Sequence, residues 1–310
     1  MNTTRLPRLS WLWPLLVSVA AGPILTFAQG SLTPPGPAGP LMKSLDQVEP
    51  RTPVDAIHTP GNGSEQFIIS QPGSYYLTTN ILGVSGKDGI EITSDNVTLD
   101  LNGFSLLGVG SSGEGIHSSG RSVVVRNGTI KNWTTVGIYD AASSGPTGVF
   151  DRLIICSNAS DGIDLHHGAV VRDCVIEENS GFGIYSSGLS RITGCTVDSN
   201  GGAGIGLELT GSCLVMDNFV FGNSTNTGPS YGEIYMNSPS NHIEGNRVIL
   251  TSALAYGIYV YPISSNTNNV IVKNDVAGGG TRNYNIGAGN DVGPIGTATN
   301  STSPWANISH

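Results

Sequence analysis

A recurring Gly-Ile pair is the feature that most constrains what this chain can fold into. From Gly89 onward the pair, or a close variant, places isoleucines at Ile90, Ile116, Ile138, Ile163, Ile184, Ile205, Ile234 and Ile258. The steps between them are 26, 22, 25, 21, 21, 29 and 24 residues. A period of about 20 to 30 residues is typical of a solenoid, in which each unit buries its apolar face only by stacking on its neighbours. We therefore expect these isoleucines to line one shared interior.

A second phased segment follows each Gly-Ile pair. Aligning "AVVRDCVIEENS", "SRITGCTVDSNG", "CLVMDNFVFGNS" and "NHIEGNRVILTS" gives one apolar column of Val171, Ile192, Val215 and Ile243 and another of Ile176, Val197, Val220 and Val248. Asn158, Asn179, Asn200 and Asn223 also fall in register. Stacked asparagines can hydrogen-bond along the axis of a solenoid and tolerate left-handed backbone at a turn.

The composition selects among the solenoids. Leucine is too sparse for a leucine-rich repeat, the six-residue period of left-handed β-helices is missing, and no Gly-Gly-x-Gly-x-Asp calcium repeat occurs. With 43 glycines and only 12% charged residues, the chain is rich in turns and poor in helix-forming runs. The sequence predicts an all-β protein, a parallel β-helix of eight to ten coils.

Two longer segments resemble a known family. They are "GSYYLTTNILGVSGKDGIEITSDNVTLDLNGFSLLG" and "NYNIGAGNDVGPIGTATNSTSPWANIS". Together with the repeats they are similar to right-handed parallel β-helix proteins of the pectin-lyase-like superfamily, and most of all to a group of uncharacterised exported bacterial β-helix proteins. The resemblance covers about residues 61 to 310 and implies the right-handed fold. Because the superfamily includes lyases, hydrolases, epimerases and adhesins, it implies no single function.

The segments before and after the repeats suggest an exported protein. Residues 1–28 combine Arg5 and Arg8 with an apolar run and small residues at its end, which predicts a cleaved signal peptide, although a membrane anchor is the alternative. We expect a Pro/Gly-rich linker and cap over 29–60, with a short helix at 42–48, the β-helix over 61–290 and a tail over 291–310. The protein would then be secreted, periplasmic or on the cell surface.

The net charge limits the partners. Removing two arginines and no acid with residues 1–28 changes the net charge from −9 to −11. Nucleic acid and anionic membranes are excluded as partners on this ground, because phosphates are bound by clustered Lys and Arg. A polysaccharide or cell-surface glycan, neutral or bridged by a cation, is the expected partner. No cofactor is expected apart from Ca²⁺ as an alternative.

Strand alternation predicts one continuous outer face. If each isoleucine points inward, the next residue points outward, and so does the residue two further on. The first outward column is Glu91, His117, Tyr139, Asp164, Tyr185, Gly206, Tyr235 and Tyr259, and the second is Thr93, Ser119, Ala141, His166, Ser187, Glu208, Asn237 and Tyr261. Aromatic rings can stack on sugars, so the substrate-binding candidates are His117, Tyr139, Tyr185, Tyr235, Tyr259 and Tyr261. The alternative is an aromatic ladder that packs only on itself.

Asp164, His166 and Glu208 are the catalytic candidates on this face. Asp164 as acid and Glu208 as base, about 10 Å apart from the strand spacing, would leave room for a water as in inverting glycosidases, and His166 could relay a proton. The protein would be a polysaccharide hydrolase or lyase if it is an enzyme. The polygalacturonase and epimerase motifs of the superfamily are missing, so the resemblance assigns no catalytic residue. A non-catalytic spacer or adhesin-like protein is the alternative.

Two further pairs stack in adjacent coils. Glu177 and Asp198 should lie about 5 Å apart, close enough to recruit a cation. Cys174 and Cys195 share a column at a separation that permits a disulfide, but two unbonded packing residues fit the same spacing.

Overall fold

The computed structural model describes residues 49–142, 148–225, 231–251, 255–278 and 282–310. The expected signal peptide at 1–28 and the short helix at 42–48 lie outside these residues, as does most of the expected linker. Within them the chain forms thirty β-strands and no α-helix. No helix in this part of the chain is long and apolar enough to cross a membrane.

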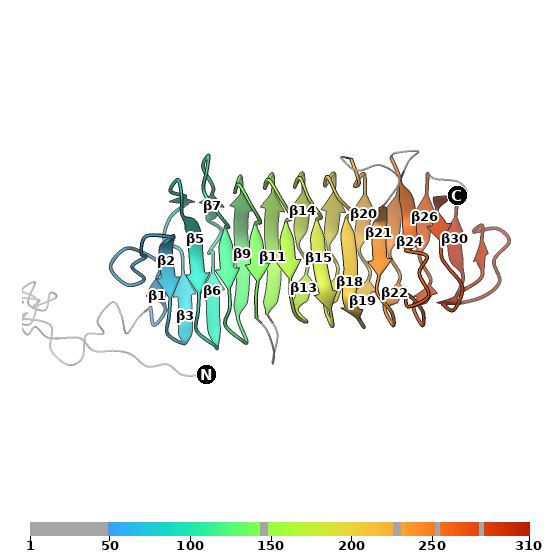
Figure 1. Ribbon diagram of the computed structural model, residues 1–310, viewed down its shortest axis with the longest axis horizontal. Helices are drawn as coiled ribbons and strands as arrows, with labels where there is room; N and C mark the ends of the chain where they lie inside the picture. Colours follow the sequence, from blue (N-terminus) through green and yellow to red (C-terminus); the bar gives the residue numbers. More distant parts are fainter. Residues whose placement is uncertain (1–48, 143–147, 226–230, 252–254, 279–281) are drawn as a thin grey trace, which may run out of the picture. The chain divides into compact units, whose positions relative to one another are not determined.

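Ten strands, one from each successive coil, form one parallel sheet (Figure 1). They are β2 (Glu65–Ile69), β5 (Asp88–Ile92), β8 (Ile116–Ser118), β10 (Ile138–Asp140), β12 (Ile163–Leu165), β15 (Ile184–Gly188), β18 (Ile205–Gly211), β21 (Gly232–Asn237), β24 (Tyr256–Val260) and β27 (Tyr284–Asn285). Parallel pairing between coils is the connectivity of a β-helix, because each strand returns beside its predecessor only after a full winding.

The other twenty strands form a second sheet, which consists of two parallel stacks. One stack contains β1 (Thr52–Pro53), β3 (Gly73–Tyr76), β6 (Val97–Asp100), β13 (Val170–Arg172), β16 (Arg191–Thr193), β19 (Leu214–Met216), β22 (His242–Glu244), β25 (Val270–Val272) and β28 (Asp291–Val292). The other contains β4 (Ile81–Leu82), β7 (Ser105–Leu107), β14 (Val175–Glu177), β17 (Thr196–Asp198), β20 (Phe219–Phe221), β23 (Arg247–Ile249), β26 (Asp275–Ala277), β29 (Ile295–Gly296) and β30 (Asn307–Ser309). The long strands β9 (Val124–Lys131) and β11 (Val149–Cys156) pair with both stacks and join them.

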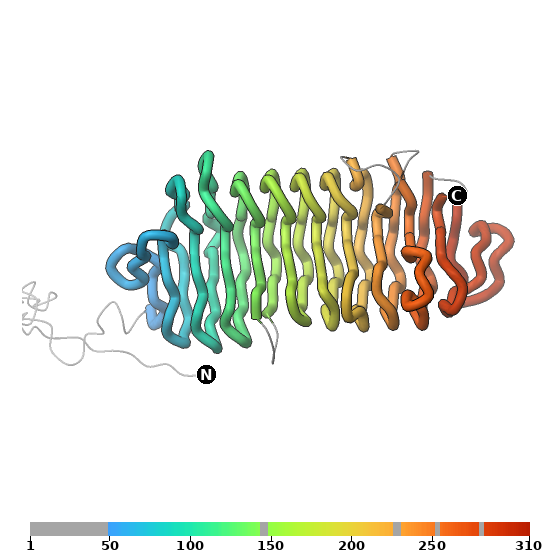
Figure 2. The backbone as a smooth tube through the Cα atoms, viewed as in Figure 1, coloured from blue at the N-terminus to red at the C-terminus, as the bar shows by residue number. Residues whose placement is uncertain are grey.

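The predicted interior columns are confirmed. The isoleucine of every Gly-Ile unit pairs in register with that of the next coil, from Ile90 to Ile258. All eight are fully buried. The columns that begin at Val171 and Ile176 are likewise in register and buried. The coils therefore stack directly on one another (Figure 2), and burial of these side chains is the main source of stability.

The glycine of the pair points inward at the corner of the coil. At Gly183 a Cβ atom would lie 2.5 Å from Val197 Cγ1 and 2.8 Å from Asn200 Nδ2, which no larger residue could tolerate. Two consecutive residues, the glycine and the isoleucine, therefore face the interior. The residue before the glycine is turned outward as a result, although strict alternation counted from the isoleucine would direct it inward.

The stacked asparagines form the hydrogen-bonded ladder that the sequence predicts. Asn158 Nδ2 donates to Asn179 Oδ1 (2.8 Å), Asn179 to Asn200 (2.9 Å) and Asn200 to Asn223 (2.8 Å). The same acceptor oxygens receive the backbone N–H of the preceding asparagine. At the end of this ladder Asn223 Nδ2 donates to the buried carboxylate of Glu233 (2.7 Å).

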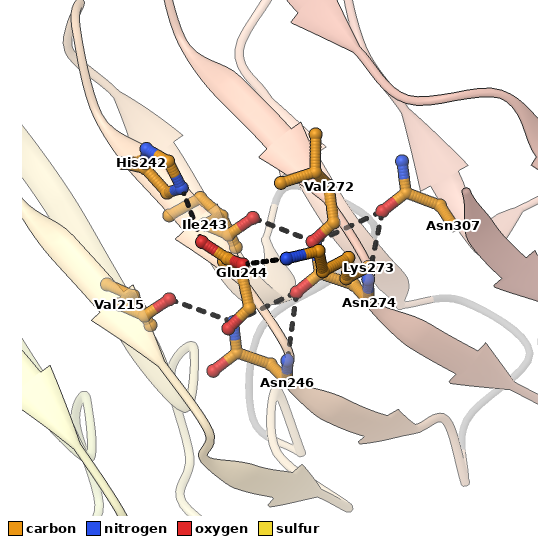
Figure 3. A network of polar contacts seen from close by, with 9 residues as sticks. All are labelled: Val215, His242, Ile243, Glu244, Asn246, Val272, Lys273, Asn274 and Asn307. Atoms are coloured by element: carbon orange, nitrogen blue, oxygen red, sulfur yellow. Dashed lines mark hydrogen bonds and ion pairs between the residues drawn. The ribbon is translucent and has the colours of Figure 1, made fainter. Parts of the chain in front are cut away.

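A second asparagine ladder lies between the two stacks of the larger sheet. Asn218, Asn246, Asn274 and Asn307 donate in turn along the axis, at 2.9, 2.9 and 3.2 Å. Figure 3 shows its last three members, beside the ion pair of Lys273 with Glu244. Asn307 belongs to the C-terminal segment, so the ladder ties that segment to the coils.

The sheets extend beyond the expected limits of 61 and 290. β1 pairs with β3 in register, Thr52 opposite Tyr75, and β30 pairs with β26, Asp275 opposite Ile308. The expected cap and tail therefore contribute strands of their own. Their pairing covers backbone groups that an open end would leave exposed.

Candidate functional site

The outer face of the ten-stranded sheet carries the predicted first column. Glu91, His117, Tyr139, Asp164 and Tyr185 are paired successively across neighbouring strands. The column continues through Gly206, Tyr235 and Tyr259. Residues that are more than twenty positions apart in the sequence are thus lateral neighbours on one surface.

A cleft of about 370 Å³ opens in the middle of this face. Its lining residues are Asp161, Asp164, His166, Ser180, Gly181, Phe182, Tyr185, Gly202 and Tyr231. Three rings and three ionisable groups therefore face the same space. Gly206 is necessary for this arrangement, because a Cβ there would lie 2.9 Å from the ring of Phe182.

Asp164 and His166 lie together as predicted. His166 Nε2 is 3.7 Å from Asp164 Oδ1, and the imidazole also packs edge-on against Tyr139 with 4.9 Å between ring centroids. Burial raises the pKa of Asp164, and His166 opposes part of that rise. Asp164 Oδ1 is buried and accepts no hydrogen bond. A buried oxygen without a donor is costly, so a ligand that supplies a donor would stabilise this side chain.

Asp161 is a cleft residue that the sequence reasoning missed. Its Oδ1 accepts the backbone N–H of Phe182 in the next coil at 2.6 Å. Burial raises its pKa to about 6, although the Phe182 N–H favours the charged form. Asp88 has the same role three coils earlier in the repeat series, where it accepts the backbone N–H of Glu114 at 2.7 Å. The shared signal is Asp immediately before Gly-Ile.

Asp161 and Phe182 belong to a third outward column, made of the residues that precede the inward glycine. Its members include Asp88, Glu114, Val136, Asp161, Phe182, Ala203 and Tyr256. From Gly89 to Gly183, the N–H of each such glycine donates to the next coil, as Gly162 N–H does to Phe182 O (2.9 Å), and these bonds hold the column in register. Strict alternation counted from the isoleucine does not predict this column. The glycine before seven of the eight isoleucines, with Glu233 before Ile234 as the exception, is the signal that could have revealed it.

Glu208 lies further from Asp164 than the sequence suggests. Asp164 is in register with Tyr185 and Gly206, so Glu208 is two strands away and also two residues further along. Two strand spacings and two residue rises place the Cα atoms about 12 Å apart, not about 10 Å. Burial raises the pKa of Glu208, while a hydrogen bond from the Tyr185 side chain lowers it. The Asp164 and Glu208 acid–base pair stays a prediction.

A β-bulge displaces the chain at Glu208. Ser186 pairs with Leu207 but Gly188 pairs with Gly211, so Glu208, Leu209 and Thr210 stand opposite a single residue. Bulges re-aim side chains and are frequent beside functional sites. The sequence carries a sign of it, since ten positions separate Ile205 from Val215 but only eight separate Ile184 from Ile192.

Two of the predicted binding tyrosines are buried. Tyr235 and Tyr259 are only 5% and 8% exposed, because Tyr231 and Tyr256 pack on them with ring centroids 4.9 and 4.6 Å apart. They form a packed floor, as the ladder alternative predicted. Tyr261 is 41% exposed.

The remaining binding candidates keep accessible surface. Tyr139 and Tyr185 are half-buried, as is His117, whose ring lies 5.1 Å from that of Tyr139. Phe182 continues the series, with ring centroids 5.6 Å from Tyr185 and 5.3 Å from Tyr231. Phe182 and Tyr231 therefore replace Tyr235 and Tyr259 as the aromatic walls beside Tyr185.

Residues that could hold a metal gather at the N-terminal part of the face. Asp88, Glu114 and His117 each bring one ligand atom within 4.8 Å of the others. His117 Nδ1 is 3.3 Å from both Glu91 and Glu114. Burial, together with Asp88 and Glu91, raises the pKa of Glu114 to about 7 against the opposing effect of His117. One nitrogen and two carboxylates suit a transition metal better than Ca²⁺, which prefers six to eight oxygens.

Glu177 and Asp198 pair in register, as predicted. They are not part of any group of three possible ligands from His, Cys, Asp or Glu in the described residues. Metal binding by this pair stays a prediction. All four cysteines are free thiols, so Cys174 and Cys195 are stacked without a disulfide.

The fold defines a parallel β-helix protein, with a cleft on the outer face of one sheet. Residues 67–221 match the family described as "Right handed beta helix region", and the chain belongs to this family. Residues 154–292 also match the family described as "Periplasmic copper-binding protein (NosD)". Across the described part of 154–292, three His, Cys, Asp or Glu ligand atoms never come together, so these residues do not fit a copper site built from such ligands.

Solved structures share the fold at low sequence identity. The A-module of mannuronan C-5 epimerase AlgE6 from Azotobacter vinelandii is 12% identical, with a TM-score of 0.54, and the match covers 81% of this chain and 79% of that one. The Dettilon tailspike protein is 14% identical, with a TM-score of 0.52, over 79% of this chain and 60% of the tailspike. A search of curated proteins found no match.

Proposed function

We propose that this protein is exported and binds an extracellular polysaccharide in the cleft around Asp164 and Tyr185. The observation that carries the proposal is the cleft itself, which combines the rings of Phe182, Tyr185 and Tyr231 with the carboxylates of Asp161 and Asp164. Aromatic rings bind the apolar faces of sugar rings, and a small number of polar groups bind the hydroxyls.

The long flat face favours a polymer over a single sugar. The first outward column runs across eight successive strands, and Tyr139 and His117 extend the accessible aromatic surface toward the N-terminal coils. The epimerase with the same fold is named for its action on a polysaccharide, mannuronan, which supports the proposal only by analogy of fold.

The geometry supports binding better than turnover. Asp161, the carboxylate nearest in sequence to Asp164, is already engaged by the Phe182 N–H. Glu208 is displaced along its strand by two residues. An acid–base pair needs two carboxylates that flank the same glycosidic bond. Asp164 has no second carboxylate at the expected position.

The test is a polysaccharide panel with the purified protein, scored both for retention and for release of reducing ends. We expect retention on at least one polysaccharide, with an affinity loss of about tenfold or more for Asp164→Ala and for Tyr185→Ala, since each removes about 1.5 kcal/mol or more of contact. Phe219→Ala is the matched control, because Phe219 is an exposed aromatic residue of the other sheet. Affinities left unchanged by both cleft variants would refute the proposed site.

A further inference from the structure

The two sheets differ in how far permanent positive charges balance their acids. The strands of the ten-stranded sheet contain Glu65, Asp88, Glu91, Asp140, Asp164, Glu208 and Glu233, and no Lys or Arg. The strand residues with a permanent positive charge are all in the twenty-stranded sheet: Arg126, Lys131, Arg152, Arg172, Arg191 and Arg247. The strands that form the face with the cleft thus contribute no permanent positive charge, and the nearest one to this face in the C-terminal coils is Arg282, which lies over the ring of Tyr256.

Several acids on the twenty-stranded sheet form ion pairs with Arg or Lys. Asp151 is 2.9 Å from both Arg152 and Arg172, and Glu244 is 2.7 Å from Lys273. Figure 3 shows the Glu244 and Lys273 pair. On that sheet, Asp151 and Glu244 are therefore balanced by basic side chains.

The cleft carboxylates have no such compensation. The cleft lining includes neither Lys nor Arg, and His166 is the basic residue that faces Asp164. Asp164 Oδ1 is buried without a hydrogen-bond donor. A third carboxylate, Glu208, lies on the far side of Tyr185. The cleft therefore presents negative potential and an unused acceptor at the same point, beside rings that can hold a sugar.

We propose that the polysaccharide bound in this cleft carries amino groups, as a polymer of amino sugars does, and that one ammonium group donates to Asp164. This inference rests on the proposed function and names its ligand class. An ammonium group has three donors and no acceptor, and its hydrogen bonds to carboxylates are among the strong ones. A uronic acid polymer would instead place its carboxylates against Asp161 and Asp164 without an intervening cation.

Three oligosaccharides distinguish the ligand classes by titration calorimetry at low salt in the presence of EDTA. Chitosan oligosaccharides carry free amines, chitin oligosaccharides have the same backbone with the amines acetylated, and oligogalacturonates carry carboxylates. We expect chitosan to bind about tenfold or more tightly than chitin, which corresponds to one charge-assisted hydrogen bond. The preference should shrink as salt is added, because screening weakens exposed charge interactions.

The variant Asp164→Asn tests whether the preference for chitosan over chitin depends on the charge of Asp164. The amide keeps the size of the side chain and removes its charge, so we expect the chitosan preference to fall to about twofold or less while chitin affinity is retained. Asp198→Asn, on the other sheet, should keep the full preference.

The outcomes separate this inference from the proposed function. Equal binding of chitosan and chitin, tighter binding of oligogalacturonate, or a preference that survives in Asp164→Asn would overturn the amino-sugar assignment and leave glycan binding in place. Failure of the wild-type protein to bind any polysaccharide, in this set or in the panel, would overturn both.

Discussion

Replacing Glu233 with glutamine should make the protein more stable at neutral and alkaline pH. Glu233 is fully buried, and it accepts hydrogen bonds from the backbone and side-chain nitrogens of Asn223 at the end of the first asparagine ladder. Burial raises its pKa from 4.5 to about 7, against the opposing effect of the Asn223 hydrogen bonds. The glutamine amide oxygen can accept the same bonds without placing a charge in the interior.

The sign and size of the effect follow from proton linkage. Because the folded state holds the Glu233 proton more tightly than the unfolded state does, this group favours folding at acid pH. Its contribution is lost as the pH rises from about 4.5 through about 7. A pKa difference of about 2.5 corresponds to about 3 kcal/mol. We expect the free energy of unfolding of Glu233→Gln to exceed that of the wild type by up to this amount at alkaline pH and to match it at acid pH.

Urea unfolding, followed by circular dichroism at several pH values, measures the effect. The comparison isolates Glu233, because the buried carboxyl groups of Asp140 and Asp161, whose pKa values burial also raises, are the same in both proteins. Parallel pH profiles for the two proteins, or a variant that is the less stable one at alkaline pH, would refute the reasoning.

Three further predictions follow from the packing. Asn200→Ala should lower the free energy of unfolding by about 2 to 4 kcal/mol, since it leaves the backbone N–H of Asn179 and one of the two Nδ2 hydrogens without an acceptor in the interior; urea unfolding checks this, and a loss below about 1 kcal/mol would contradict it. Gly206→Ala should weaken polysaccharide binding several-fold with little change in melting temperature, because the new Cβ displaces the Phe182 ring; unchanged affinity by calorimetry would count against Phe182 as a cleft wall. Alkylation followed by mass spectrometry should find Cys174, Cys195 and Cys213 unreactive until the protein is unfolded and all four thiols free afterwards; a peptide linking Cys174 to Cys195 would show the opposite.

The repeat period was enough to predict the stacking. Ile163 and Ile184 pair in register because a 21-residue step equals one coil, and the same step brings Asn158 beside Asn179. Asp164 and Tyr185 then follow as neighbours on the outside, since alternation within a strand is a local property of the backbone.

What the repeat period could not predict is how side chains from the corners cover the face. Tyr235 points outward as expected, but Tyr231 and Tyr259 pack on its ring and exclude solvent. Phe182 reaches the cleft because the inward glycine turns the preceding residue outward. These features depend on contacts between coils, which alternation counted from one residue does not contain.

The repeat period also does not predict the bulge at Glu208 or the position of the C-terminal segment. An insertion of two residues shows in the spacing, but which residues leave the register depends on the backbone pairing of Leu207 and Gly211. Asn307 lies outside the regular repeat, yet its side chain continues the second ladder. Long-range pairing, not local pattern, decides both.

A crystal structure of the protein with a bound chitosan oligosaccharide would test the central claim most directly. The outer face of the ten-stranded sheet should hold the ligand, with one sugar ring against Tyr185 and an amine within hydrogen-bond distance of Asp164 Oδ1. A ligand seated instead in the cavity of about 420 Å³ beside Trp305 and Val270 on the other sheet, with the Asp164 cleft left free, would contradict it.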